Sequence, residues 1–277
     1  MQILRADHLG MCFGVRDAIA LARQQASIRP ITVLGELVHN EQVLSDLRAA
    51  GVQIESDLSK VQTRHAIITA HGASEKAMNA AREHGLELLE GTCPLVHHAH
   101  QAVRDLARKG YFPVIIGKKD HVEVRGLTGD LDEFAVVLSE EDVDALPFKP
   151  KIGVASQTTQ PTHRVQYLLG RIRERFPTAD IHFRDTVCRP TRQRQEAAEE
   201  LARKCDVVIV IGGANSNNTR ELVNTCSRFC EQVHHVQFPG EVQQAWFAGK
   251  ERIGITAGTS TPDELIDSVE EEIRRFN

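Results

Sequence analysis

The sequence lacks the features that mark secreted and membrane-spanning proteins. Its longest purely aliphatic stretch, VVIVI at 207–211, is far too short to cross a bilayer. The first residues, MQILRADHLG, contain no charged segment followed by a long apolar one, so they predict no secretory signal. We therefore expect a cytoplasmic protein with no membrane partner.

The chain also has no excess of positive charge, and it has few Trp and Tyr residues. The chain has 33 Lys and Arg against 38 Asp and Glu, a formal charge of −5, with one Trp and two Tyr. A nucleic-acid surface needs a basic patch, and binders of single strands need aromatic rings for stacking, so we expect no nucleic-acid partner. An anionic ligand would have to be held by local hydrogen-bond donors, because a general positive field is missing.

Several common catalytic motifs are missing as well. The chain has no Walker A sequence, no G-x-G-x-x-G, no G-x-S-x-G and no H-E-x-x-H. These absences argue against nicotinamide dehydrogenases, serine hydrolases and metalloproteases of the familiar kinds. The six cysteines form no C-x2-C pair, the spacing typical of structural zinc. In the cytoplasm they are expected to be reduced, metal-bound or catalytic.

Short β-rich runs alternate with longer amphipathic stretches along the whole chain. The runs predict strands at 2–6, 31–34, 66–70, 86–90, 113–117, 151–156, 180–185, 207–212 and 252–258. The stretches between them are rich in Ala, Arg, Glu and Leu, and several end at Gly or before Pro, as helices do. Strand–helix alternation with apolar strands predicts an α/β fold with mostly parallel sheets covered on both faces.

Three cysteines stand in the same local context: Cys12, Cys93 and Cys188. Each follows a predicted strand after a short turn, and each precedes a helix-like stretch. This repetition predicts three pseudo-equivalent α/β units. We place them at residues 1–93, 94–187 and 188–277, and we expect the C-terminal helix to pack back on the first unit.

Each predicted unit carries two further strand ends with polar tips. The first has ELVHN with His39 and TAHGAS with His71. The second has GKKDHVEVRG with His121 and Glu123, and SQTT with Thr158 and Thr159. The third has NSNNT with Ser216, Asn217 and Asn218, and GTST with Ser260. Ligands of open α/β sheets bind beyond the carboxyl ends of strands, so three facing units would bring the cysteines and six tips into one cavity.

The chemistry of the tips suggests an anionic ligand. Hydroxyls, amides and backbone N–H groups at helix starts can bind phosphate without a lysine, although N-capping alone explains each of them. The strand-end histidines are suited to an anion or to proton transfer. Glu123 could donate protons if a dry cavity raised its pKa, although an ordinary exposed glutamate is the simpler interpretation.

The three repeated cysteines fit two kinds of metal centre. Three thiolates with a histidine suit zinc, and three thiolates with an open fourth position suit a four-iron cluster with one iron free for substrate. Three unrelated buried thiols are the structural alternative, which the repeated context makes less favourable. Spacing alone leaves these alternatives open.

The other cysteines and histidines receive simpler interpretations. We expect Cys205, Cys226 and Cys230 to be buried structural thiols. The histidines of helix-like or loop stretches are expected to be solvated; these are His97, His98, His100, His163, His234 and His235.

Eight motifs, in order along nearly the whole chain, resemble those of a known family. They are GMCFGV, ELVHN, TAHGAS, GTCPLV, GKKDHVEVRG, SQTT, NSNNTREL and TAGTSTPD. Together they resemble the LytB/IspH family, 4-hydroxy-3-methylbut-2-enyl diphosphate reductase. The resemblance implies a trefoil of three α/β units around a central [4Fe-4S] cluster. It also implies that Cys12, Cys93 and Cys188 ligate the cluster and that the fourth iron is open to substrate.

The same resemblance implies a reaction and a role for each matching residue. The reaction is reductive dehydroxylation of an allylic diphosphate to isopentenyl and dimethylallyl diphosphate, the last step of the non-mevalonate pathway. A ferredoxin or flavodoxin would deliver two electrons singly. Glu123 would be the proton donor, His121 its neighbour in the relay, and Thr158 the residue that orders the substrate hydroxyl. The implied substrate contacts are His39, His71, His121, Thr158, Thr159, Ser216, Asn217, Asn218 and Ser260.

The sequence departs from the family pattern at three positions. Asn217 stands where many members have a second serine, Val122 replaces a common proline, and Pro190 stands where an alanine commonly precedes the threonine. These departures leave room for the first of three alternatives, and the other two use the same residues for another chemistry. The three alternatives are a paralogue that acts on another allylic phosphate, a zinc-dependent hydrolase that uses the same cysteines, and a non-catalytic diphosphate-binding protein.

Overall fold

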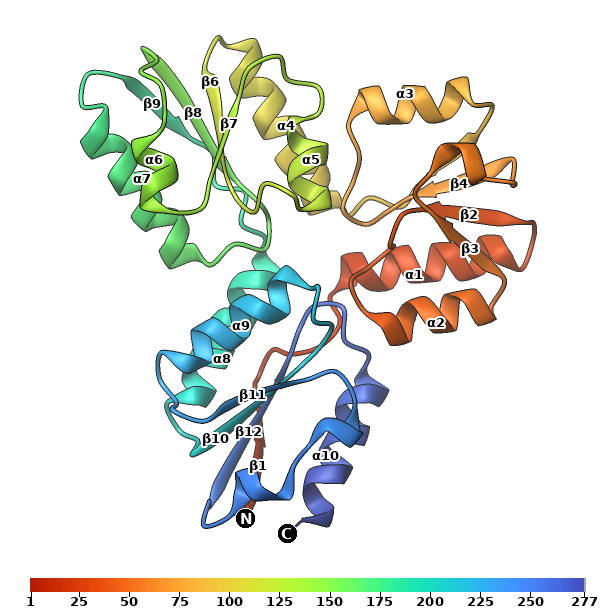
Figure 1. Cartoon of the computed structure of the whole chain (residues 1–277), viewed down its shortest axis with the longest axis vertical. Coiled ribbons are helices and arrows are strands. Elements are labelled where there is room, and N and C mark those ends of the chain that lie inside the picture. The colour runs from red at the N-terminus through yellow and green to blue at the C-terminus, as the bar shows by residue number, and fades with distance from the viewer. Residues whose placement is uncertain (277) are drawn as a thin grey trace. The chain divides into compact units, whose positions relative to one another are not determined.

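The computed structural model describes residues 1–276 and contains twelve strands there. The strands are β1 (Gln2–Arg5), β2 (Ile31–Leu34), β3 (Val52–Glu55), β4 (His65–Ile68), β5 (Glu87–Glu90), β6 (Phe112–Ile116), β7 (Ala135–Val137), β8 (Lys151–Ser156), β9 (Asp180–Phe183), β10 (Val207–Ile211), β11 (Val233–Val236) and β12 (Arg252–Ala257). They form three four-stranded sheets with the orders β1-β12-β10-β11, β3-β2-β4-β5 and β7-β6-β8-β9 (Figure 1). Every neighbouring pair is parallel, which confirms the predicted α/β class.

Helices connect the strands, as parallel pairing requires. The α-helices are α1 (Phe13–Ala26), α2 (Glu41–Ala49), α3 (Glu75–Glu83), α4 (Pro94–Arg108), α5 (Val122–Thr128), α6 (Glu140–Asp144), α7 (Thr162–Arg175), α8 (Arg189–Ala202), α9 (Asn217–Ser227) and α10 (Asp263–Arg275). Short 3-10 helices cover η1 (Leu58–Lys60), η2 (Pro239–Glu241) and η3 (Gln244–Phe247). None of the helices within residues 1–276 combines the length and apolar character needed to cross a membrane.

The chain divides into two compact units. Residues 1–16, 38–45 and those from 189 onward form one unit, and residues 17–37 and 46–188 form the other. From here on these two are called the first unit and the second unit, in place of the three predicted units. The first contains the sheet β1-β12-β10-β11, and the second contains the other two sheets. The trefoil arrangement and the boundaries after residues 93 and 187 stay predictions.

Strand β1 belongs to the sheet of the C-terminal segment. It pairs with β12, from Gln2 opposite Arg252 to Arg5 opposite Ile255. Helix α10 packs beside it, since Arg5 donates from Nε to Glu270 at 2.5 Å. The first residues therefore extend a sheet whose other strands come from the far end of the sequence, and they do not pair with the strands at 31–90.

Burial on both faces explains why β10 is apolar at every position. Val207, Ile209 and Ile211 pack in one core cluster with residues of α10. The alternate residues Val208 and Val210 pack in another, with residues of α8 and α9. Successive side chains of a strand point to opposite faces, so a strand covered by helices on both faces needs an uninterrupted apolar run.

The three sheets repeat one strand order, and the sequence patterns miss the same strand in each. Strands β5, β9 and β1 are edge strands, each beside one of β4, β8 and β12, and the opposite edges are β3, β7 and β11. These opposite edges are the strands that the sequence did not predict. They have three or four residues, and β3 (VQIE) and β11 (VHHV) are half polar, so their apolar signal is weak.

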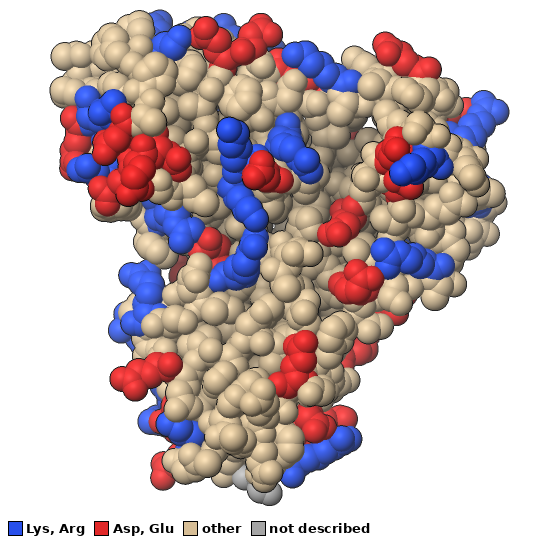
Figure 2. Space-filling model, in the orientation of Figure 1, with Lys and Arg blue, Asp and Glu red and all other residues tan. Residues whose placement is uncertain are grey.

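Acidic and basic side chains are interspersed on the face of the molecule that Figure 2 shows. On the face in Figure 2, Lys and Arg lie among Asp and Glu and do not gather into one large basic surface. Any anion bound by this chain must therefore be held by specific donors, which directs attention to the polar strand ends.

Candidate functional site

The three repeated cysteines have the same backbone partner in each sheet. The N–H groups of Cys12, Cys93 and Cys188 donate to the carbonyls of Thr259, Ala70 and Thr158, at 3.0, 3.1 and 3.0 Å. Each acceptor is the second residue after the end of the strand next to the edge, namely β12, β4 and β8. The three cysteines therefore occupy equivalent positions. Each is fixed by a hydrogen bond to the loop that follows the neighbouring strand of its sheet.

Each of these cysteines also directly precedes a helix. Cys12 comes before α1, Cys93 is the N-cap residue of α4, and Cys188 comes before α8. All three are half-buried and lie outside disulfides. The positive end of a helix dipole favours anionic sulfur, which is the form that binds iron or zinc. Their chemistry and placement thus fit thiolate ligands.

The structure leaves the ligand set itself untested. Within residues 1–276, no group of three or more His, Cys, Asp or Glu side chains lies close enough together to hold a metal ion. Cys12 belongs to the first compact unit, whereas Cys93 and Cys188 belong to the second. Joint ligation by the three cysteines stays a prediction.

The polar tips repeat in the same way. His39, His121 and Ser216 each stand five residues after the end of β2, β6 and β10. His71, Thr159 and Ser260 each stand three residues after the end of β4, β8 and β12. The candidate residues of all three sheets therefore follow the carboxyl ends of the two inner strands, where α/β proteins bind their ligands.

Glu123 is the buried acid of the second unit. Its exposed fraction is 2%, and Thr158 donates to its carboxyl group twice, from N–H to Oε1 at 2.6 Å and from the hydroxyl to Oε2 at 3.0 Å. Burial raises the pKa of Glu123 to about 7, although the two hydrogen bonds from Thr158 lower it. Desolvation wins because it disfavours the carboxylate more than two donors stabilise it. Near neutral pH this residue can therefore give up a proton.

His121 lies beside this acid and begins helix α5. Its Nδ1 accepts a hydrogen bond from the Glu123 N–H at 3.1 Å. A neutral ring that accepts at Nδ1 carries its proton on Nε2. The ring of His71 meets that of His121 edge-on, with centroids 5.6 Å apart. Two imidazoles and an acid are thus gathered in one place.

Backbone links tie this group to two of the cysteines. The Thr158 carbonyl accepts from Cys188, while the Thr158 N–H and hydroxyl hold Glu123. Ala70, which accepts from Cys93, directly precedes His71. The second unit therefore positions its acid and its histidines relative to the same turns that fix Cys93 and Cys188.

The first unit gathers hydrogen-bond donors. The Asn218 side chain is 2% exposed, and its Oδ1 accepts from the Thr259 N–H at 3.0 Å. Its Nδ2 has no hydrogen-bond partner among residues 1–276. A buried donor without a partner is costly, and an anionic ligand would satisfy it. Because Thr259 also accepts from Cys12, this donor lies close to the cysteine loop.

Two serines and a histidine complete this group. Ser216 caps α9 by accepting from the Thr219 N–H at 3.3 Å, so the N-capping interpretation is correct for it. The Ser216 hydroxyl hydrogen remains able to donate to a ligand. Ser260 donates to the His39 carbonyl at 3.4 Å. A Cβ at Gly213 would lie 2.2 Å from that carbonyl oxygen, so only glycine allows His39 to approach so closely.

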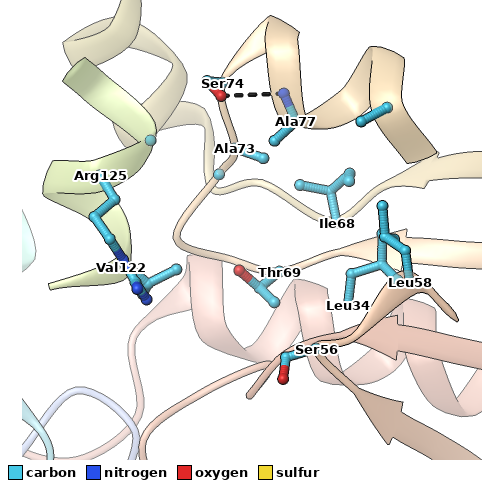
Figure 3. A pocket seen from close by; sticks show the side chains of 13 residues that line it. Leu34, Ser56, Leu58, Ile68, Thr69, Ala73, Ser74, Ala77, Val122 and Arg125 are labelled. Carbon is cyan, nitrogen blue, oxygen red and sulfur yellow. Dashed lines mark hydrogen bonds between the residues drawn. The ribbon is translucent and has the colours of Figure 1, made fainter. Parts of the chain in front are cut away.

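A cavity of the second unit, close to His71 and Glu123 in the sequence, is not lined by the predicted residues. It has a volume of about 380 Å³ and lies between α3, α5 and the strands β2 and β4 (Figure 3). Thr69 and Ala73 border it on one turn, and Val122 and Arg125 border it on α5. None of the thirteen lining residues is one of the candidate residues. The cavity is therefore a neighbour of the candidate site and not the site itself.

The structure corrects the expectation for three histidines. His97, His98 and His163 are exposed, as predicted. The prediction for His100 is wrong, because this residue is buried on the inner face of α4 with an exposed fraction of 6%. His234 and His235 are half-buried on β11, where His234 stacks on Trp246 and His235 lies 2.7 Å from the Gly212 carbonyl oxygen.

Sequence reasoning also missed a buried cation. Arg194 of α8 donates from Nε to the Gly10 carbonyl at 2.9 Å and from Nη1 to the Pro190 carbonyl at 3.1 Å. It thereby braces the loop that leads to Cys12. Arginine within RPTRQRQ shows no pattern that separates a buried guanidinium from an exposed one, so only the fold reveals it.

Comparison with known proteins gives concordant results. The model of the LytB protein family matches residues 3–274. The proteins named 4-hydroxy-3-methylbut-2-enyl diphosphate reductase of Pelobacter propionicus and Caldanaerobacter subterraneus subsp. tengcongensis are both 37% identical to this chain. The alignments cover 100% and 99% of this chain and 99% and 97% of those relatives.

Solved structures agree with the family match. The structure of E-1-hydroxy-2-methyl-but-2-enyl-4-diphosphate reductase from Plasmodium falciparum has a TM-score of 0.92 at 28% identity, covering 97% of this chain and 86% of that one. A structure of (E)-4-hydroxy-3-methyl-but-2-enyl diphosphate reductase, described as the terminal enzyme of the non-mevalonate pathway, has a TM-score of 0.70 at 35% identity. It covers 99% of both chains.

Proposed function

Because this chain belongs to the LytB protein family, we propose that it is a 4-hydroxy-3-methylbut-2-enyl diphosphate reductase. The observation that carries the proposal is the resemblance to such reductases over the full length of both chains, at 37% identity. The reaction is a reductive dehydroxylation. It breaks the allylic C–O bond, consumes two electrons and two protons, releases water and forms a C–H bond in isopentenyl or dimethylallyl diphosphate.

The electrons require a redox group, for which the repeated cysteines are the candidates. We propose that Cys12, Cys93 and Cys188 hold one [4Fe-4S] cluster per chain, with an open fourth iron. The bound cluster would supply electrons one at a time. Three equivalent half-buried cysteines, each at a helix start, support this assignment. A one-electron protein donor, a ferredoxin or flavodoxin, would match that chemistry.

Glu123 is proposed as the proton source. Its pKa of about 7 leaves much of it protonated at neutral pH, and its burial keeps water from competing for the proton. Thr158 would order the substrate hydroxyl beside the acid, a role supported by the two hydrogen bonds that it donates to the Glu123 carboxyl group. His121 would return a proton to Glu123 after each transfer.

The donors at the strand ends are proposed to bind the diphosphate. In the first unit these are His39, Ser216, Asn217, Asn218 and Ser260, and in the second they are His71, His121 and Thr159. Neutral hydroxyls, amides and imidazoles can hold an anion in a protein whose formal charge is −5. The unpartnered Nδ2 of Asn218 supports this most directly. We also propose a cytoplasmic location, which the six cysteines outside disulfides support.

Anaerobic turnover tests the proposal. Protein purified without oxygen is expected to convert 4-hydroxy-3-methylbut-2-enyl diphosphate to the two products when supplied with a chemically reduced dye. A protein that contains a cluster and binds the substrate but does not convert it would instead indicate a paralogue or a binding protein. A colourless protein with stoichiometric zinc would indicate the hydrolase.

A further inference from the structure

His100 is a buried imidazole that the proposed reaction does not use. It lies on α4, seven residues after Cys93, with an exposed fraction of 6%. Burial lowers the pKa of His100 to about 4, so the ring is neutral at physiological pH. Its Nε2 has no hydrogen-bond partner among residues 1–276. A buried polar atom left unsatisfied in this way calls for an explanation other than hydrogen bonding.

The ring of His100 instead fills the space between two glycines. A Cβ at Gly72 would lie 2.9 Å from His100 Nε2, and a Cβ at Gly126 would lie 3.3 Å from both Cε1 and Nε2. That Cβ at Gly126 would also lie 3.5 Å from the Gly72 carbonyl oxygen. The ring, the turn at Gly72 and the helix at Gly126 are therefore in mutual contact, with no room for another methyl group.

Both glycines belong to segments that carry candidate residues. Gly72 directly follows His71 in the turn after β4, and Gly126 lies on α5, one turn after Glu123. The same two glycines also border the 380 Å³ cavity, which His100 does not line. At the end of α5, Ser74 packs against Gly129, and the Asp130 carboxylate accepts from the N–H groups of Glu75 and Lys76. Nearer to His71, the ring of His100 is the side chain that contacts both Gly72 and Gly126, so it sets the spacing between the turn and the middle of α5.

We propose that His100 is a positioning residue, whose ring fixes the spacing between the turn at residues 69–74 and helix α5. Through this spacing it places His71 against His121 and Glu123. The inference rests on the proposed function for the identity of the ligand, a diphosphate, and on packing alone for the role of the ring.

The test compares His100→Ala with His98→Ala, an exposed residue on the same helix. Binding of inorganic diphosphate is measured by calorimetry, the cluster by visible absorption, and turnover by KM and kcat. Because small displacements of binding groups are costly, His100→Ala is expected to weaken diphosphate binding and raise KM by about 10-fold to 100-fold, with a smaller loss of kcat. The visible spectrum is expected to stay unchanged, and His98→Ala is expected to behave like wild type.

Two further variants separate positioning from general destabilisation. His100→Gln keeps most of the side-chain volume and stays neutral. It is expected to bind diphosphate within about threefold of wild type, because a change of shape at nearly constant volume has a small effect. Gly126→Ala places a methyl group against the ring and is expected to raise KM by itself. In the His100→Ala background the same change is expected to raise KM much less, because the ring that the methyl group would meet is gone.

The proposal is overturned if His100→Ala binds diphosphate as well as wild type, if His100→Gln is as impaired as His100→Ala, or if the two substitutions are additive. Failure of the proposed function gives a different result. In that case wild-type protein would not convert the allylic diphosphate, while its binding of inorganic diphosphate would still respond to His100→Ala.

Discussion

The six cysteines fall into two sets of three with different surroundings. Cys12, Cys93 and Cys188 are half-buried in loops that begin helices, and their N–H groups are fixed by equivalent carbonyls. The other three lie where α8 and α9 pack against the C-terminal sheet. Cys226 and Cys230 are buried there, as predicted, whereas the prediction is wrong for Cys205, which is half-buried.

Cys205 and Cys226 of the second set behave as neutral thiols. Burial raises the pKa of Cys205 to about 11 and that of Cys226 to about 12. The Cys226 thiol donates to the Ala198 carbonyl at 3.8 Å, and the Cys230 thiol donates to the Gln232 carbonyl at 3.4 Å. A thiol held protonated in a core is a poor metal ligand, whereas a sulfur at a helix start is a good one. Environment, and not residue type, thus separates the two sets.

The largest expected effect contrasts one cysteine from each set. Cys188→Ser is expected to lose or cripple the cluster, so that visible absorption and turnover fall together by more than about 100-fold, the scale set by loss of a redox ligand. Cys226→Ser should retain both and lose only about 1–2 kcal/mol of unfolding free energy, from a polar hydroxyl in a core. Iron content and denaturant unfolding measure the two outcomes. Equal behaviour of the variants would mean that the two sets do not differ in function.

The next effect concerns Glu123, the buried acid that accepts two hydrogen bonds from Thr158. Glu123→Gln is expected to keep the cluster and the affinity for substrate and to lower kcat by about 10²-fold to 10⁴-fold, because the general acid is lost. Glu83→Gln on the exposed face of α3 is the matched control and should leave kcat unchanged. A Glu123→Gln enzyme with normal single-turnover rates would remove this residue as the proton source.

The pH dependence follows from the sign of the Glu123 shift. The pKa is raised from 4.5 to about 7, so the folded protein binds this proton more tightly than the unfolded chain does. Its contribution to stability therefore falls as the pH rises from 4.5 to about 7. A proton donor is active only while protonated, so kcat/KM is expected to fall about tenfold per pH unit above that pKa. The range from about pH 7 to about pH 9 covers the expected fall of kcat/KM. A value of kcat/KM that stays constant over this range would contradict the assignment.

A substitution at Thr158 is expected to shift the pH at which kcat/KM falls. Its hydroxyl donates to Glu123 Oε2 and so lowers the pKa of the acid. Thr158→Val removes this donor and is expected to shift the falling limb of kcat/KM to higher pH, as measured with substrate well below KM. A shift to lower pH would show that burial and hydrogen bonding do not control this carboxyl in the way described.

The smallest expected effect concerns the donor in the first unit. Asn218→Ala removes the unpartnered Nδ2 and is expected to raise KM about tenfold, the value of one hydrogen bond to a charged group, with little change in kcat. Asn79→Ala, on the surface of α3, is the control. A lower kcat with unchanged KM would place Asn218 in the chemical step and not in diphosphate binding.

The sequence was most informative where a local signal repeats. Strands β2, β4, β6, β8, β10 and β12 lie within sheets and are largely apolar, and each was predicted together with candidate residues at the polar tip that follows it. The context of the three cysteines predicted their equivalence, which the hydrogen bonds to Thr259, Ala70 and Thr158 confirm. Short edge strands such as β7 were missed because three residues carry too little periodicity.

The environment of single side chains was harder to predict. His100 lies four residues after Val96 and three before Val103, so helical spacing already indicated the buried face of α4. Its polar character outweighed that signal in our prediction, although a glycine-lined space can hold a neutral imidazole. For Glu123 and Asn218, burial depends on contacts with Thr158 and Thr259, which lie 35 and 41 residues away. No local pattern contains that information.

The most direct test of the central claim is the metal and sulfide content of the full-length protein purified without oxygen, together with its visible spectrum. We predict a brown protein with about four iron atoms per chain, as a [4Fe-4S] cluster requires. We predict that this absorption disappears in the Cys12, Cys93 and Cys188 serine variants and persists in the Cys226 variant. A colourless protein, or one that binds stoichiometric zinc through the same cysteines, would contradict the account.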